Sequence, residues 1–179
     1  NLQASQVDFN ADTILAQMTR MTAYEESGAE ITQLTGNLRL TNKNLRLQNM
    51  ALRTPNSYIG DSIYLEYYSF HGFENYPYEV DMTAMLQDSR LAVEDLDRFA
   101  PGLSELLQGD MTISGEVRGT VDNLRGRNID LRYGRQSRFK GRFDVTGLMD
   151  AQESFIEFRI AELATNSEDL EELLPDINF

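Results

Sequence analysis

The sequence predicts a mostly β protein, an antiparallel sheet with one apolar face and one or two short helices that end at proline. Apolar and polar residues alternate in roughly eight segments along the chain. Short turns rich in Gly, Asn and Asp separate these segments. Because side chains alternate between the two faces of a strand, the apolar residues of each segment all fall on one face.

The first periodic stretch, "ADTILAQMTRMTAYEESG" at 11–28, fits two structures. Ile14, Met18 and Met21 have helical spacing, whereas Ile14, Ala16 and Met18 also suit a strand. We expect a strand, because the segments that follow all have the two-residue period.

The next segment, 34–52, predicts a hairpin that contains a bulge. Leucines alternate with polar residues over 34–41, an "NKN" turn follows, and Leu45 and Leu47 resume the pattern. At Asn49 the phase slips by one residue, so that Met50 and Leu52 become the apolar pair. A slip of one residue within a strand is typical of a β-bulge.

Six more segments predict strands, and an aromatic loop, "HGFENYPY" at 71–78, interrupts them. The hairpin "YGRQSRF" at 133–139 joins two of these strands, and Asp61 is a polar exception at an apolar position. The apolar positions of the six segments lie within 59–67, 80–86, 111–121, 129–133, 139–147 and 156–160.

Two stretches instead have the pattern of short helices. In 93–108 the apolar residues have helical spacing and Pro101 divides the stretch; 166–177 opens on Asn166 or Ser167 as N-cap and stops at Pro175. The two align at a constant offset of 74, with Asp95 matching Asp169. We therefore expect repeat units that end near 108 and 177, within a single fragment (1–179) of a longer protein.

Composition argues against an enzyme. The chain has no cysteine and one histidine, His71, so thiol catalysis and the usual zinc sites are excluded. No serine has a plausible base partner, and the glycines lie in strands and turns rather than in a phosphate-binding loop. We expect no catalytic residues, no metal and no cofactor.

Charge is strongly negative, with 29 acidic and 16 basic residues and a net charge of −13. Segment 118–142 is the exception, with eight basic residues against two acidic ones. Such a block can meet phosphates or anionic lipid headgroups, but we favour arginines that keep strands soluble. Nucleic acid is not expected as a partner, because the bulk charge repels it and few aromatics accompany the arginines.

The order of motifs resembles that of the TamB (translocation and assembly module) proteins of Bacteroidetes-type bacteria, within the wider AsmA-like group. The resemblance covers roughly residues 10–175, because strand motifs in the same order run through that range. It is carried by "LTGNLRLTNKNLRLQNMALRTPNSYI", "DLDRFAPGL", "SGEVRGTVDNLRGRNIDLRYG" and "FKGRFDVTGL", and most specifically by the pattern from Gly115 to Asn128.

The resemblance implies a periplasmic segment of a protein anchored in the inner membrane, which works with an outer-membrane partner of the Omp85 class. It implies a curved, open sheet of the β-taco kind, whose apolar groove moves phospholipid towards the outer membrane or serves outer-membrane protein assembly. Gly115, Gly119 and Gly141 would then allow tight curvature or close approach of a ligand.

The expected contacts of phospholipid acyl chains are the apolar residues of the alternating segments. They are Leu38, Leu40, Leu45, Leu47, Ile63, Leu65, Val80, Met82, Ile113, Val117, Val121, Ile129, Leu131, Phe139, Phe143, Ile156, Phe158 and Ile160. Two alternatives stay open. In the first, the apolar face is a sealed core. The protein could also be a structural or protein- or glycan-binding β module without lipid cargo, which uses the aromatic segment "YYSFHGFENYPY" at 67–78.

Overall fold

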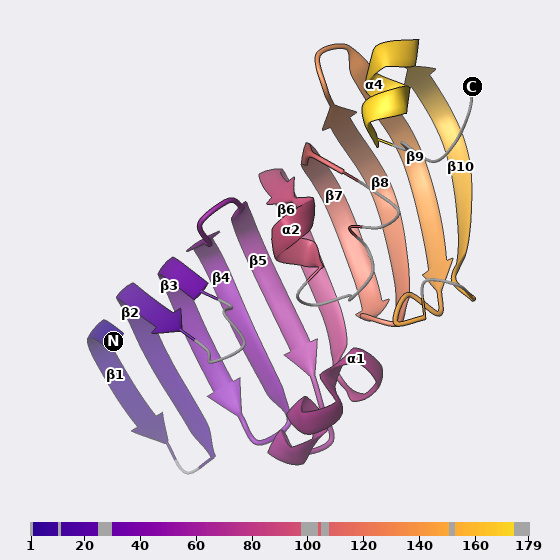
Figure 1. Ribbon diagram of the computed structural model, residues 1–179. Coiled ribbons are helices and arrows are strands. Elements are labelled where there is room, and N and C mark those ends of the chain that lie inside the picture. The colour runs from indigo at the N-terminus through magenta and orange to yellow at the C-terminus, as the bar shows by residue number, and fades with distance from the viewer. Residues whose placement is uncertain are drawn as a thin grey trace.

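A computed structural model shows one antiparallel sheet of ten strands that follow one another in chain order, from β1 at one edge to β10 at the other (Figure 1). The structure describes residues 2–10, 12–24, 30–97, 104, 108–150 and 153–173. The strands are β1 (Leu2–Asn10), β2 (Thr13–Tyr24), β3 (Glu30–Thr41), β4 (Asn44–Arg53), β5 (Tyr58–Glu66), β6 (Asp81–Ala92), β7 (Asp110–Thr120), β8 (Asn123–Tyr133), β9 (Ser137–Thr146) and β10 (Phe155–Ala164). The predicted fold class, a mostly β antiparallel sheet, is confirmed.

Beside the sheet, the described residues form the short helical segments η1 (Phe70–Asn75), α1 (Tyr76–Glu79), α2 (Val93–Leu96) and α4 (Ser167–Leu173). The expected N-cap of the last helix is in place, because Asn166 Oδ1 accepts a hydrogen bond from the Asp169 amide at 2.8 Å. The two prolines expected to end helices, Pro101 and Pro175, lie outside the described residues, as do most positions of 98–107.

Three sequence-based expectations differ from the structure. The segment 2–10 was not predicted, yet it forms β1. The aromatic loop at 71–78 is helical instead, because Pro77 fits the first turn of α1 and the rings of Phe70 and Phe73 pack on Tyr67, with centroids 5.4 and 4.8 Å apart. Val121 lies in the turn after β7 rather than in the strand.

A line of β-bulges crosses the whole sheet, since each of its nine strand pairings contains a shift in register. Asn49 is at one of these shifts, with φ 49°, which confirms the predicted bulge. The other residues with positive φ along the line from β3 to β9 are Gly36, Asp61, Asp88, Gly115, Asn128 and Gly141. Bulges bend strands and increase twist, so an aligned series curves the sheet as a unit.

The bulge line passes through a sequence repeat that the alignment of the two helices at offset 74 does not identify. Segments 34–53 and 113–132, which form β3–β4 and β7–β8, align at an offset of 79 without gaps and are identical at nine positions. The offset falls to 74 at the helices, because the β5–β6 connection (67–80), which contains η1 and α1, is longer than the β9–β10 connection (147–154). The unit is thus four strands and a short helix, and the expected unit ends near 108 and 177 stay predictions.

The helical segments lie at the ends of the strands (Figure 1). At one end, the hydroxyl of Tyr67 donates a hydrogen bond to the Thr41 carbonyl at 2.9 Å, and the amide of Asp122 donates to the Pro77 carbonyl at 3.0 Å. At the opposite end, α2 meets the β4–β5 turn and α4 meets the β8–β9 turn through hydrogen bonds of Asp95 and Asp169. The strands between these ends form the two faces of the sheet.

Candidate ligand-binding face

One face of the sheet, here called the apolar face, is lined by two cross-strand rows of apolar residues that include all ten strands. Each residue in a row is the direct partner of the next. The first row is Phe9, Ile14, Leu40, Leu45, Leu65, Met82, Gly119, Leu124, Val145 and Ile156. The second row is Val7, Ala16, Leu38, Leu47, Ile63, Ala84, Val117, Gly126, Phe143 and Phe158. The rows are about 7 Å apart, since they are two residues apart along each strand.

Near the bulge line the apolar face holds two clusters of buried side chains. One, on β2–β4, comprises Met18, Leu34, Leu47 and Met50; the other, on β7 and β8, comprises Ile113, Val117 and Ile129. Around them the apolar residues are only partly buried. The clusters give the sheet its packed centre, and the remaining apolar surface has no cover among the described residues.

Exposure rises from the middle of the sheet towards both of its edge strands, β1 and β10. Ile129 in β8 is 2% exposed, whereas Phe158 and Ile160 in β10 are 56% and 55% exposed. Side chains of this size are normally buried, and a contiguous exposed apolar surface marks a site of interaction. In β1, at the other edge, Phe9 is 76% exposed and Val7 is 44% exposed, so among the described residues the apolar face is most accessible at its two edge strands.

The structure places most of the expected lining residues on this face. Eleven of them belong to the two rows: Leu38, Leu40, Leu45, Leu47, Ile63, Leu65, Met82, Val117, Phe143, Ile156 and Phe158. Ile113, Ile129, Leu131, Phe139 and Ile160 lie beside or beyond the bulge line. Val80 and Val121 are separate from the rest, because Val80 follows α1 and Val121 is in a turn.

Several residues of the apolar face were not among the expected lining. Met18, Leu34 and Met50 are its most buried members on β2–β4, and Leu124 and Val145 belong to the first row. Their alternation was visible in the sequence. What was missing was the register, which identifies the residues that are direct neighbours.

Aromatic side chains form the apolar surface next to the β10 edge. The ring of Phe158 lies 5.5 Å from that of Phe139 and 6.5 Å from that of Phe143, both in edge-on arrangements. Phe143 lies over Gly126, where a methyl group would come within 2.2 Å of its ring. The missing side chain at Gly126 thus makes room for an aromatic ring of the protein itself.

The glycines at the bulge line have a different role from the expected ligand approach. A Cβ at Gly115 would lie 2.7 Å from the carbonyl oxygen of Asn128, and one at Gly141 would lie 2.1 Å from that of Arg159. Both residues have positive φ, 135° and 159°. They allow neighbouring backbones to approach at the bulges, which supports the curvature and leaves no cavity for a ligand.

The carboxylates of Asp95 and Asp169 attach α2 and α4 to turns between strands at one end of the face. Asp169 is 5% exposed and accepts hydrogen bonds from the amides of Arg135, Gln136 and Ser137 and from the Ser137 hydroxyl. The Ser137 hydroxyl and these amides hold the pKa of Asp169 below its usual value. Asp95 accepts from the hydroxyls of Thr54 and Ser57 in the equivalent turn, the latter at 2.7 Å.

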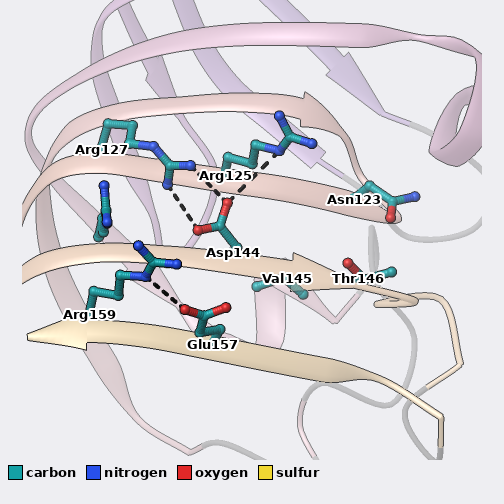
Figure 2. Close-up of a pocket in the computed structure, with 9 residues that line it drawn as sticks. Asn123, Arg125, Arg127, Asp144, Val145, Thr146, Glu157 and Arg159 are labelled. Carbon is teal, nitrogen blue, oxygen red and sulfur yellow. Dashed lines mark hydrogen bonds and ion pairs between the residues drawn. The ribbon is translucent and has the colours of Figure 1, made fainter.

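The opposite side, here called the polar face, carries ion pairs. Arg127 donates to both oxygens of Asp144 at 2.8 and 3.2 Å, and Figure 2 shows the pair beside Arg159 and Glu157. Hydrogen bonding from Arg127 lowers the pKa of Asp144, and hydrogen bonding from Arg138 lowers that of Asp130. These groups are charged at neutral pH and keep this face in water.

In the described part of the chain, no three His, Cys, Asp or Glu side chains come together in a way that could hold a metal ion. Among the same residues, none of the helices has the length and apolarity needed to span a bilayer. Comparison of the chain with protein-family models, curated proteins and solved structures finds no match in any of the three. The function therefore has to be argued from the two faces of the sheet.

Proposed function

We propose that the apolar face binds the acyl chains of phospholipid and that the sheet is one segment of a longer path along which such lipids move. The observation that carries this is the pair of apolar rows across all ten strands, with exposed apolar side chains at both edge strands. The resemblance to TamB and other AsmA-like proteins supports the same function, a periplasmic location and an outer-membrane partner of the Omp85 class.

The physical requirement of an acyl chain is modest. It needs apolar surface that replaces water, and each methylene fully removed from water contributes about 0.8 kcal/mol. A surface of half-exposed leucine, isoleucine and phenylalanine side chains supplies this without any polar group placed for a reaction. Because the apolar side chains at the edge strands are exposed, a charged headgroup can remain in water while its acyl chains lie on the sheet.

Native mass spectrometry of the gently purified protein, with solvent extraction of what it carries, tests the proposal. We expect bound phospholipid in the wild type, and loss of it in Leu65→Glu and Phe158→Glu. Leu65 is partly exposed and Phe158 is 56% exposed, so the substitutions place a charge on the binding surface rather than inside one of the two buried clusters. The matched control is Thr112→Glu, on the polar side of β7 and directly opposite Arg132.

The control should retain the lipid and give the same circular dichroism spectrum as the two apolar-face variants. A folded wild-type protein that carries no lipid, and takes none up from vesicles, would contradict the proposal. Equal retention by all three variants would contradict it as well, because the bound lipid would then lie elsewhere.

The aromatic segment offers the second candidate, a binding module for protein or glycan. Tyr68 is 92% exposed and Tyr78 is 55% exposed, whereas Tyr67 is buried and anchors Phe70 and Phe73. Exposed tyrosines on an anchored turn are typical of recognition surfaces. If this candidate holds, Tyr68→Ser together with Tyr78→Ser abolishes partner binding while Leu65→Glu leaves it intact.

A further inference from the structure

The polar face carries a cross-strand row in which two pairs of arginines flank two neutral hydroxyl-bearing residues. The row from β3 to β8 is Arg39, Arg46, Tyr64, Thr83, Arg118 and Arg125. It spans five strand intervals, or about 24 Å. We call this set the arginine row.

The two arginine pairs are equivalent positions of the repeat. Arg39 and Arg46 align with Arg118 and Arg125 at the offset of 79, and each pair is directly opposed on neighbouring strands. Like charges in direct cross-strand contact destabilise a sheet. Their presence in both units of a chain with net charge −13 suits a negatively charged ligand better than solubility alone.

A shallow pocket of about 360 Å³ lies at the middle of the row. Arg46 and Arg118 stand at its two sides, and Ser62, Tyr64 and Thr83 provide hydroxyl groups between them, with the Gln48 amide alongside. None of the residues lining this pocket is a carboxylate. Glu116, which pairs with Arg118, and Glu66, which accepts from the Tyr64 hydroxyl at 2.9 Å, lie outside the lining.

The neighbouring pocket, drawn in Figure 2, is less available to an anion. Its arginines face two carboxylates of the protein: Arg127 and Arg125 lie against Asp144, and Arg159 pairs with Glu157 at 2.7 Å. These internal counterions already occupy the positions that a ligand's anionic groups would take. In the central pocket Arg118 also has such a counterion, Glu116, but Arg46 lies over the Tyr64 ring instead, so the central pocket is the more available of the two.

We propose that the arginine row binds a linear anionic glycan, with its acidic groups on Arg39, Arg46 and Arg118 and its hydroxyls over the central pocket. Serine, threonine, tyrosine and glutamine offer both donors and acceptors, as a hydroxyl-rich ligand requires. Guanidinium groups suit carboxylate or sulfate substituents. This site is on the opposite face from the acyl-chain surface and does not depend on it.

Two other linear polyanions fit less well. One face of the Tyr64 ring is covered by the Arg46 guanidinium, 4.9 Å from its centroid, and no second aromatic side chain among the described residues lines the pocket for successive nucleobases to stack on. An extended acidic peptide satisfies its backbone by pairing with a sheet edge, which a row across the face does not offer. The observations therefore favour the glycan.

Calorimetric titration with a hexasaccharide of galacturonic acid, at low and at physiological salt, tests the proposal. We expect saturable binding that weakens at higher salt, no binding of neutral maltohexaose, and at least a ten-fold loss of affinity in Arg46→Gln and in Arg118→Gln. The matched control is Arg132→Gln, which removes the same charge from the same face outside the pocket, and it should change affinity less than three-fold.

Equal losses in all three variants would overturn the proposal, because they indicate unspecific attraction to positive charge. Absence of hexagalacturonate binding would overturn it too. So would equal or tighter binding of hexaglutamate, of a short single-stranded DNA or of phosphatidylglycerol vesicles, since the row would then select a peptide, a nucleic acid or a membrane surface. Because the arginines are exposed, the variants should fold as the wild type does, which circular dichroism verifies.

Discussion

Asp169 accepts a hydrogen bond from the Ser137 hydroxyl at 2.8 Å, and this contact joins the helix after β10 to the turn between β8 and β9. The same contact occurs once more in the chain, where Asp95 accepts from Ser57 at 2.7 Å and joins α2 to the β4–β5 turn. Each four-strand unit is thus closed by one carboxylate. Through these contacts α2 and α4 are attached at the strand ends.

We expect the attachment of α4 to weaken at acidic pH. The pKa of Asp169 is lower in the folded protein than its usual value near 3.8, so its contribution is complete at pH values above that value and is lost as pH falls through the folded pKa. Hydrogen exchange of the amides in 167–173, followed between pH 3 and 6, should show increased exposure at the acidic end relative to β8 amides. Asp169→Asn should show that exposure at every pH; a wild-type protection pattern in this variant would contradict the attachment.

The second prediction concerns the contribution of the bulge-line glycines to stability. Gly115→Ala adds a methyl group 2.7 Å from the Asn128 carbonyl at φ 135°, so we expect it to lower the free energy of unfolding by about 2 kcal/mol or more. Gly72→Ala is the matched control, because its methyl group meets nothing closer than 3.7 Å, and we expect a change within about 0.5 kcal/mol. Urea unfolding measures both. Equal stabilities would mean that the bulges are not constrained by backbone approach.

A third expectation concerns the polar face. Because hydrogen bonding from Arg127 is the main cause of the lowered pKa of Asp144, Arg127→Gln should raise that pKa towards its usual value. Arg142 acts on Asp144 only through a weaker charge interaction, so Arg142→Gln should raise it less. Carboxyl carbon chemical shifts, recorded against pH, distinguish the two variants. A larger shift in Arg142→Gln would contradict the bidentate pair.

Much of the fold could be predicted from the sequence, because a two-residue period directly reports which side of a strand is apolar. The bulge at Asn49 was predicted from a slip in that period. The bulges at Gly36, Gly115 and Gly141 were not predicted, because a glycine there leaves the two-residue apolar period in phase. The positive φ of a glycine cannot be deduced from the sequence. Asp61 appeared as a polar exception, and its φ of 92° shows that it has the bulge position that glycine occupies in β3, β7 and β9.

The two surfaces differ in how far the sequence could describe them. Leu40, Leu45 and Leu65 could be assigned to one apolar face, but their direct adjacency depends on registers that follow from the hydrogen-bonded pairing. The arginine row depends on registers entirely, because Arg46 and Arg118 are 72 positions apart in the sequence and converge on one pocket. The repeat at offset 79 is present in the sequence, and it alone indicates that the pair Arg39 and Arg46 is equivalent to the pair Arg118 and Arg125.

The last expectation separates the two faces by their response to salt. A short-chain phosphatidylcholine, below its critical micelle concentration, should stabilise the wild type, by about 2.7 kcal/mol at a free concentration one hundred times its Kd. Since acyl chains bind by removal of apolar surface from water, this stabilisation should persist in 0.5 M NaCl, whereas hexagalacturonate binding should be largely lost. Leu65→Glu should abolish the first effect and retain the second; Arg46→Gln should do the reverse. Thermal unfolding with each ligand measures both, and loss of both effects in either variant would contradict two independent surfaces.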